Sequence, residues 1–420
     1  MKCENWTIKF FTFAIILSPF LKQYTSLLPG VTLGDVTLGI SCLFLLLSLR
    51  FNNITKKIIP LLLLWLFGTF VTLCSVFIQQ ELTFEIATRF IRYSFYVFLV
   101  LIASNNFNLK YALKIYRVLC ILTSTYIIVQ VIIYNSAGMI LPYKLLPIPW
   151  ASGNTFGSDY VISIAQKYYY RPSGIFIEPG YAAQFLLPGL SFSLFGWMKL
   201  QKVDIKGTLI IFTALTLSTS SQGIFIGVSI LGLYVLSFIR TNENYYNLLK
   251  KLVIMSVSVV VLIFFLKLDV VQSSINKVTG EIRGGSSVSL RIFRGIAVYK
   301  ELPILFKIVG VGHGNLGNYV MRNGISTQYD PAIITPATAD YANGVSTVLL
   351  YYGIFGFFLL VNLYWSFLRN TNNAFRLIAI TQIILTLVEG AFFDVSIVFY
   401  FSFVYAGYYT IKQVKVKGEL

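Results

Sequence analysis

The sequence predicts an all-α, polytopic integral membrane protein with about twelve transmembrane helices. Three observations predict this class. The chain of 420 residues is 56% hydrophobic and only 12% charged. Apolar runs of about membrane length, roughly 20 residues, recur along most of it. Its 36 Phe and 27 Tyr suit helix packing in lipid and the aromatic belts at membrane interfaces.

The first apolar run, IKFFTFAIILSPFL, resembles a signal peptide. It lacks a small-x-small cleavage site and leads directly into a second run, so we expect it to be retained as the first helix. The predicted spans are residues 7–21, 31–49, 58–78, 84–103, 115–134, 180–198, 206–219, 222–239, 252–266, 344–368, 376–388 and 393–411.

Basic residues in the short loops set the orientation, since Lys and Arg favour the cytoplasmic side. Every basic cluster falls on one side if both termini are cytoplasmic, and this agreement favours twelve spans over eleven or thirteen. The formal charge of +17 is therefore explained by orientation, and we expect no nucleic acid partner. The clusters are Arg50, Lys56 and Lys57; Lys110 and Lys114; Lys199, Lys202 and Lys206; Arg240, Lys250 and Lys251; Arg369 and Arg376; and Lys412, Lys415 and Lys417.

Two long loops separate three groups of membrane helices. The expected segments are N-terminal helices (1–134), a first outer loop (135–179), central helices (180–266), a large outer loop with short helices (267–343) and C-terminal helices (344–420). Both loops are basic, and an anionic ligand at the outer surface is the simplest explanation. No internal repeat is visible, which disfavours the inverted-repeat architecture of many transporters.

The stretch RPSGIFIEPG, residues 171–180, ends the first loop. Its prolines push Arg171 and Glu178 out of helical geometry, and its glycines permit turns. Such backbone is tolerated at membrane depth where protein buries it or where it lines a watery cavity. Either Arg171 and Glu178 pair at a helix entry, or Arg171 grips an anionic group while Glu178 orients it or handles a proton.

The large loop contains SSVSLRIFRGIAVYKELP, residues 286–303. Ser287 or Ser289 can cap a helix that Pro303 ends. The spacing predicts an apolar stripe through Leu290, Phe293 and Ala297.

Arg291 and Arg294 lie on neighbouring faces of this predicted helix. The helix can rest on the outer leaflet with its basic side chains toward headgroups. Alternatively, the two arginines clamp a diphosphate, because a planar guanidinium matches phosphate oxygens in bidentate geometry.

The run GVGHGNLGN, residues 310–318, follows. Glycine-rich turns can expose backbone N–H groups to phosphate oxygens, but no strand-then-helix unit indicates a nucleotide fold. His313 is the chain's only histidine, so it is either an acid–base catalyst or a structural residue. The cysteines show no spacing of metal ligands, and we expect neither a metal nor another cofactor.

Other charged residues fall at the predicted outer ends of spans. Asp340 lies just before a span that Asn343 can cap. Arg89 and Arg92 are either snorkelling anchors or ligand contacts lining a cavity. Glu389 and Asp394, in a predicted turn, are either solvated or help to balance these arginines.

Taken together, RPSGIFIEPG before a span, an arginine-bearing helix followed by GVGHGN, and YAN before LLYYGIFGFF resemble the O-antigen polymerase and ligase superfamily. The resemblance covers about 240 residues. It implies a polytopic fold of the glycosyltransferase C type with a large periplasmic loop over the active-site cavity. Ligases carry a histidine at the position of Ala342, whereas the R-x-S-G-x-F-x-E-P pattern is more similar to the Wzy-type repeat-unit polymerases.

The resemblance implies polymerisation of undecaprenyl-diphosphate-linked repeat units into a surface polysaccharide, outside the bacterial inner membrane. Donor and acceptor are then both lipid-linked glycans, with a chain-length regulator as a further partner. By the resemblance, Arg171 and Arg291 bind the lipid diphosphate. We expect Arg294, on the same predicted helix as Arg291, to assist them. Glu178, Asp340 and His313 are the candidate bases, and no metal is required. The alternatives are an O-antigen ligase and a flippase or other transporter of lipid-linked oligosaccharides.

Overall fold

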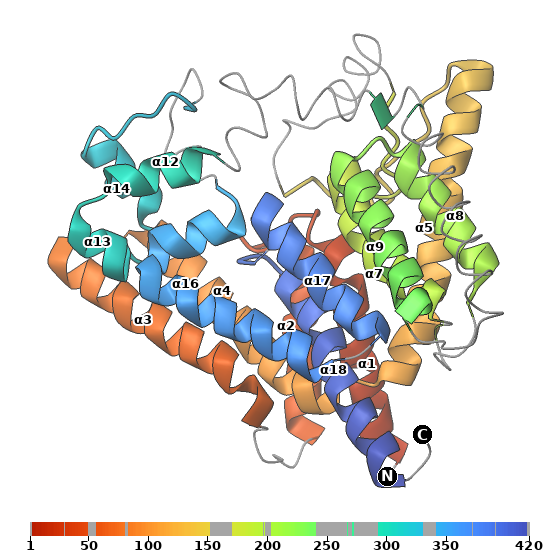
Figure 1. The fold of residues 1–420 in the computed structure, drawn as a ribbon, viewed down its shortest axis with the longest axis horizontal. Coiled ribbons are helices and arrows are strands. Elements are labelled where there is room, and N and C mark those ends of the chain that lie inside the picture. The colour runs from red at the N-terminus through yellow and green to blue at the C-terminus, as the bar shows by residue number, and fades with distance from the viewer. Residues whose placement is uncertain are drawn as a thin grey trace. The chain divides into compact units, whose positions relative to one another are not determined.

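The computed structural model describes residues 2–28, 30–48, 56–79, 83–151, 170–195, 197, 203–240, 267, 271–272, 293–330, 342–371, 373–390 and 392–417. These residues are helical apart from turns, loops and an isolated antiparallel bridge between Thr25 and Thr32. They divide into two compact units, residues 1–112 with 281–420, and residues 113–280 (Figure 1).

The first unit contains ten of the helices seen in Figure 1. They are α1 (Lys2–Leu21), α2 (Leu33–Ser48), α3 (Ile59–Gln79), α4 (Phe84–Asn106), α12 (Arg294–Glu301), α13 (Ile304–Val309), α14 (Leu316–Arg322), α16 (Gly344–Asn370), α17 (Asn373–Val388) and α18 (Ser396–Lys417). The 3₁₀ turn η1 (Lys56–Ile58) precedes α3. The second unit contains most of α5 (Leu109–Ala137), with α7 (Pro179–Leu194), α8 (Ile205–Leu217) and α9 (Ser221–Arg240).

The helical class is confirmed, and each predicted span that the structure describes overlaps a helix. Helix α7 ends at Leu194, four residues before the predicted end at 198, and the predicted span 252–266 lies outside the described residues. In the part of the chain that the structure describes, four helical stretches are long and apolar enough to cross a membrane: Lys56–Ile78, Ile86–Asn106, Leu109–Ala137 and Gly344–Asn370. Shorter apolar helices accompany them. The described residues therefore fit a helical membrane protein, while the number of spans stays a prediction.

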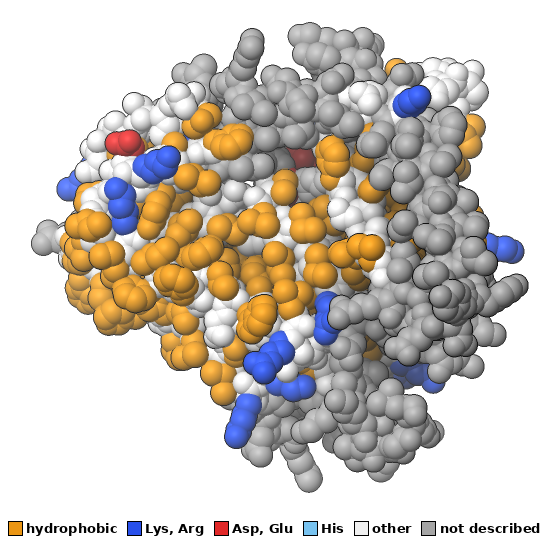
Figure 2. All heavy atoms as spheres, viewed as in Figure 1, with side chains coloured by type: hydrophobic (Ala, Val, Ile, Leu, Met, Phe, Trp, Pro, Cys, Tyr) orange, Lys and Arg blue, Asp and Glu red, His pale blue; other side chains and the backbone are white. Residues whose placement is uncertain are grey.

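Large apolar side chains cover the outside of α3 and α16. Phe70, Phe77 and Phe358 are 65%, 80% and 61% exposed. In Figure 2 this face is a broad apolar surface, with Lys and Arg side chains gathered at both ends of it. A contiguous apolar surface of this kind is unfavourable in water and favourable in lipid, so we infer that this face contacts the bilayer.

Helix α16 is broken near its first third. Gly353 has φ 63° and ψ −164°, far from helical values, and the helix changes direction there. The carbonyls of Leu350 and Tyr351 accept hydrogen bonds from the backbone N–H groups of Val311 and Gly312, at 2.9 and 3.0 Å. The turn between α13 and α14 therefore satisfies backbone groups at the break, as a membrane protein requires.

The break needs a glycine because the chains approach closely. A Cβ on Gly353 would lie 2.2 Å from the carbonyl oxygen of Ile308. In the same contact, a Cβ on Gly310 would lie 2.2 Å from the carbonyl oxygen of Tyr351. Both glycines also have positive φ, which is unfavourable for other residues.

In the second unit, α7 is the central helix, and it packs against α8 and α9. It is buried from Ala182 to Leu194. The hydroxyl of Tyr116, on α5, donates to the carbonyl of Phe185. A Cβ on Gly189 would lie 2.6 Å from the Sγ of Cys120, so α5 and α7 are in close contact. A buried α7 fixes the position of the RPSGIFIEPG segment that leads into it.

We predict that Gly353→Ala destabilises the protein by at least about 2 kcal/mol, because alanine adds a strained φ and a clash with Ile308. Apparent melting temperatures of purified protein in detergent measure this. Gly232→Ala is the control, since Gly232 lies within α9 and its Cβ would meet nothing within 4 Å. It should be neutral or slightly stabilising. Equal melting temperatures for both variants would contradict the account of the break.

Candidate functional site

The RPSGIFIEPG segment forms a non-helical shelf before α7. Glu178 is the N-cap residue of α7 and has an extended backbone. Pro179 occupies the first turn of the helix, where its missing N–H group leaves no helical hydrogen bond unmade. Gly174 has φ 66°, and its N–H and carbonyl both bond the side-chain amide of Gln130 on α5, at 2.9 and 3.1 Å. Pro172, Gly174 and Pro179 therefore act as the sequence predicts, whereas Gly180, which was expected to permit a turn, lies in the first turn of α7. Helix α5 holds the shelf in place.

Arg171 points from the shelf toward the turn between α8 and α9. Its Nε donates to the Oγ1 of Thr219 at 3.3 Å. Ser218, Thr219 and Ser220 of this turn are all buried, and Thr219 has a positive φ of 52°, which is rare for a β-branched residue. Residues 218–219 lie at the end of the predicted span 206–219, so the predicted spans did not indicate this contact. The signal was the hydroxyl-rich run STSSQG between two apolar helices.

Glu178 does not pair with Arg171. Its side chain is half-buried and makes no capping hydrogen bond, and within the described residues no ion pair joins it to Arg171. The Nε2 of Gln222 lies near Gly180, 3.3 Å from the place of a Cβ. Arg171, Glu178, Thr219 and Gln222 thus form a polar group in the second unit, which we call the shelf site. A guanidinium beside hydroxyl and amide groups suits an anionic ligand that also carries hydroxyls.

Arg294 is buried and paired inside the first unit. Its side chain is 1% exposed, and its Nε lies 2.5 Å from the Oδ1 of Asp330. The same carboxylate accepts a hydrogen bond from the backbone N–H of Thr327. Phe293 stacks on Tyr329 with ring centroids 5.7 Å apart. Arg294 therefore ties α12 to the segment that follows α14.

Arg294, on α12, is buried, although both interpretations of the sequence placed it toward headgroups or a diphosphate. The helix ends at Glu301, just before Pro303, as predicted. Its buried residues are Arg294, Gly295 and Val298, whereas Phe293 is 36% exposed. The predicted apolar stripe through Phe293 and Ala297 is thus not the buried face. The reason is that Gly295 packs against α16, where its Cβ would lie 2.4 Å from that of Ser346.

Several predicted residues lie outside the described part of the chain: Arg291, Asp340, Ser287, Ser289 and Leu290. Asn343 is the N-cap of α16, as predicted, because its Oδ1 accepts a hydrogen bond from the N–H of Ser346 at 2.7 Å. Ala342 beside it is buried.

His313 lies in a buried aromatic cluster of the first unit. Its ring stacks on Tyr93 with centroids 5.2 Å apart, and the rings of Tyr351 and Phe393 meet it edge-on, with centroids 4.9 and 5.1 Å away. Its Nδ1 is 2.9 Å from the hydroxyl of Tyr352. The side chain is 3% exposed. These surroundings favour a structural imidazole, and its role as a base stays a prediction.

Burial lowers the pKa of His313 to about 3, with the nearby Arg89 guanidinium lowering it further and a hydrogen bond to the Arg89 backbone opposing the shift. The ring is therefore neutral in the folded protein. A neutral ring in this cluster can orient a neighbouring group, while its low pKa makes it a weak proton acceptor at pH 7.

The N–H groups of the glycine turn are already used. Gly310 donates to Phe306, Val311 to Leu350, and Gly312 to Tyr351, while the N–H of His313 donates to the Oγ1 of Thr72 at 3.0 Å. The predicted phosphate cradle spans residues 310–318, and its first four residues have no free N–H group for a phosphate oxygen. The glycines allow close approach instead, since Cβ atoms on Gly312 and Gly314 would press on Ser75 and Arg89.

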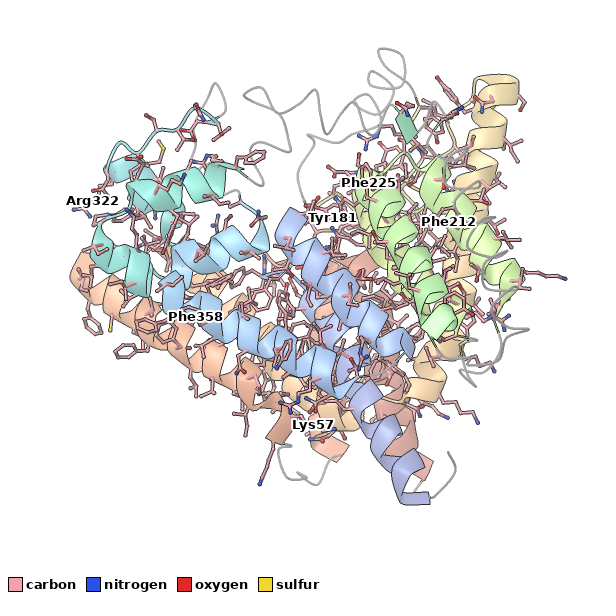
Figure 3. All side chains as sticks on the ribbon, in the orientation of Figure 1. Lys57, Tyr181, Phe212, Phe225, Arg322 and Phe358 are labelled. Carbon is pink, nitrogen blue, oxygen red and sulfur yellow. The ribbon has the colours of Figure 1, made fainter. Side chains whose placement is uncertain are left out.

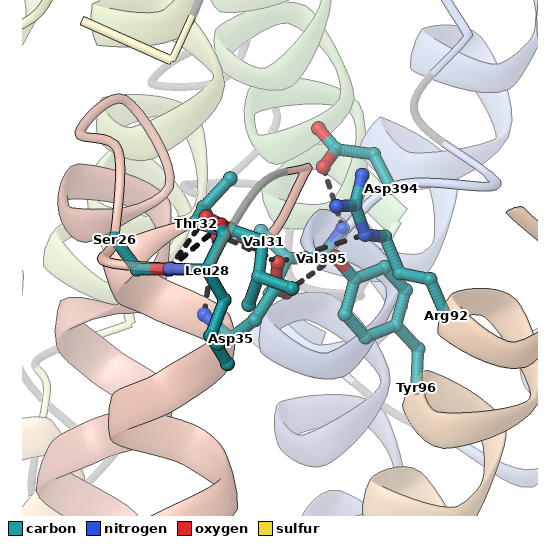
Figure 4. Close-up of polar contacts among 9 residues, drawn as sticks. All are labelled: Ser26, Leu28, Val31, Thr32, Asp35, Arg92, Tyr96, Asp394 and Val395. Carbon is teal, nitrogen blue, oxygen red and sulfur yellow. Dashed lines mark hydrogen bonds and ion pairs between the residues drawn. The ribbon is translucent and has the colours of Figure 1, made fainter. Parts of the chain in front are cut away.

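Charged residues at one end of the first unit form ion pairs (Figure 4). Arg92 Nε lies 3.6 Å from Asp35 Oδ2, and Tyr96 donates to Asp35 Oδ1 at 2.6 Å. Asp394 pairs with Lys22. Arg92 and Asp394 are thus both balanced, although by partners that sequence reasoning did not single out. The signal for Asp35 was a capping box, because Thr32 and Asp35 cap the start of α2 reciprocally.

No protein-family model matches the sequence, and no curated protein matches it either. The resemblance to polymerases therefore depends on the sequence motifs quoted above.

We predict that His313 makes folding acid-sensitive. Because its folded pKa of about 3 lies below the ordinary value of 6.5, the unfolded chain binds more protons between these pH values. The stability that neutral His313 contributes is fully present above pH ~6.5 and is lost as pH falls toward ~3. His313→Gln should melt with a shallower pH dependence across this window. Parallel melting curves for the two proteins would contradict the prediction.

We predict that Asp330→Ala destabilises the protein by about 3 to 5 kcal/mol, because it leaves the buried Arg294 guanidinium uncompensated. The double variant Arg294→Met with Asp330→Leu removes both charges and should be more stable than Asp330→Ala alone. Melting temperatures in detergent measure both effects. A double variant less stable than the single one would show that the ion pair is not what Asp330 contributes.

Proposed function

We propose that the protein is a membrane glycosyltransferase that polymerises lipid-diphosphate-linked oligosaccharide repeat units into a surface polysaccharide, of the O-antigen, capsule or exopolysaccharide kind. The reaction takes place at the outer face of the bacterial inner membrane, and both termini are cytoplasmic. The motif resemblance and the helical membrane fold support this proposal. The observation that carries it is the anchored Arg171, held on a rigid non-helical shelf against a hydroxyl-lined turn.

In the proposed reaction, the bond between the anomeric carbon of the growing glycan and its lipid diphosphate breaks. The non-reducing-end hydroxyl of a new lipid-linked repeat unit attacks that carbon and loses its proton to a base. The lipid diphosphate leaves with both bonding electrons. Arg171 and Arg291 stabilise the charge that develops on it, as preorganised cations do in other transfer reactions.

The side chains proposed for the reaction differ in burial and in hydrogen bonding, and we propose different roles for them accordingly. Arg294 and His313 are buried and bonded within the first unit, so we propose that they position other groups. Glu178 is half-buried on the shelf and makes no capping bond, which suits a base or an orienting carboxylate. Asp340 stays a candidate base because of its position in the sequence, just before the span that begins at residue 344. Thr219 is added as a positioning residue, because its hydroxyl aims Arg171.

The ligase and flippase alternatives predict different products. Loss of the polymerase should leave a glycan core that carries a single repeat unit. Loss of a ligase should leave polymer on the lipid diphosphate, and loss of a flippase should trap single units on the cytoplasmic side. Glycan gels and lipid extracts of the deleted cells distinguish these outcomes.

We predict that Arg171→Ala and Arg291→Ala each abolish long chains while the protein still inserts in the membrane. Arg171→Lys should retain little activity, because lysine cannot reproduce a bidentate contact. Arg117→Ala is the matched control: Arg117 lies in the same unit, is 52% exposed and pairs with Asp204. It should give normal chains. Glycan gels measure chain length, and normal chains from the Arg171 and Arg291 variants would exclude the diphosphate contact.

A further inference from the structure

The short helices α12, α13 and α14 expose more apolar surface than loop helices in water normally do. Ile304 is 75% exposed and Leu305 is 55% exposed, and together with Ile308 they occupy one side of α13. The whole exposed set, which we call the platform face, is Phe293, Ile296, Ile304, Leu305, Ile308 and Met321. Exposed apolar patches of this kind mark contact with a protein or a membrane.

The platform face continues the surface that contacts the bilayer. The carbonyl of Ile308 lies against Gly353 at the break in α16, and Phe355, 53% exposed, follows two residues later. Phe358, labelled in Figure 3, lies one turn further along α16. In Figure 2 the apolar surface runs without interruption from α3 and α16 to α13. Continuity with a lipid-facing surface favours lipid as the occupant.

Basic residues accompany the platform face on the same short helices. Lys300 and Arg322 are exposed and Lys307 is half-buried; we call the three the basic rim. Arg322 projects at the end of α14 in Figure 3, beyond the helices that face lipid. Apolar residues flanked by Lys and Arg are typical of helices that lie in a membrane interface and bind anionic headgroups.

Hydrogen bonds hold the platform at the height of the interface. The turn after α13 bonds Thr72 and Ser75 of α3, through the N–H of His313 and the carbonyl of Val311. These residues lie seven and four positions before Gln79, the end of α3. At a rise of 1.5 Å per residue, they are roughly 10 and 6 Å inside the end of the helix. The platform therefore cannot move far into water.

We propose that α12, α13 and α14 form an interfacial platform whose platform face enters the acyl boundary of the leaflet at the C-terminal end of α3 and whose basic rim binds anionic phospholipid headgroups. The lipid contact does not depend on the proposed function.

The test uses single cysteines in a chain whose four native cysteines are replaced by alanine, after the melting temperature has been checked. A bimane label at position 304 reports the platform face, a label at position 77 reports the face inferred to contact lipid, and a label at the exposed position 328 reports water. The proteins are reconstituted in phosphatidylcholine vesicles, with or without phosphatidylglycerol. Quenching is measured with nitroxide lipids labelled near the headgroup and with aqueous iodide.

Nitroxide lipid should quench the label at position 304 at least about threefold more than the label at Gln328, and phosphatidylglycerol should increase this quenching. Replacing Lys300, Lys307 and Arg322 by glutamine should remove the increase. Quenching at position 304 by iodide alone would overturn the proposal. Protection from both quenchers would show that protein covers the face, and would overturn it too. If the quenching changes neither when phosphatidylglycerol is added nor in the glutamine variant, the assignment to anionic lipid is overturned.

Discussion

The break in α16 is the constraint on which the first unit depends. A helix interrupted at Gly353 leaves carbonyls without helical donors, and in lipid each unsatisfied group costs several kcal/mol. The turn at residues 310–312 supplies two of these donors and is itself fixed to α3 through Thr72 and Ser75. The glycines of that turn therefore serve the packing of three helices. This explains why a sequence that looks like a phosphate loop has no N–H group to spare at residues 310–313.

In both units, arginine side chains have polar partners close to them in space. The guanidinium of Arg294 meets Asp330, that of Arg92 meets Asp35, and that of Arg171 meets a hydroxyl, Thr219. The first two are pairs of opposite charge, which neutralise a buried or partly buried arginine. Arg171 contacts the hydroxyl of Thr219, whereas Arg294 is 1% exposed and pairs with Asp330. The burial and pairing of Arg294 are the physical basis for its proposed structural role, while ligand binding by Arg171 is proposed from the motif resemblance and from its place on the shelf.

The sequence predicted most of the fold because apolar runs and caps are local signals. Asn343 and Pro303 marked helix ends correctly, and the prolines of residues 171–180 marked the shelf. The burial of Arg294 on α12 could not be predicted, because the carboxylate that pairs with it, Asp330, lies 36 residues away in the chain. The contact of Arg171 with Thr219 was hidden for the same reason, since 48 residues separate them. Spacing within one element does not reveal partners on another.

The central claim is that this chain alone joins lipid-diphosphate-linked repeat units, and reconstitution tests it most directly. Purified protein in vesicles would be supplied with an undecaprenyl-diphosphate-linked oligosaccharide, with a chelator present, and the products analysed by mass spectrometry. The account predicts lipid-linked glycans whose masses increase by whole repeat units, together with one released undecaprenyl diphosphate for each unit added. Unchanged substrate in the presence of folded, membrane-inserted protein, or substrate that only crosses the bilayer, would contradict it.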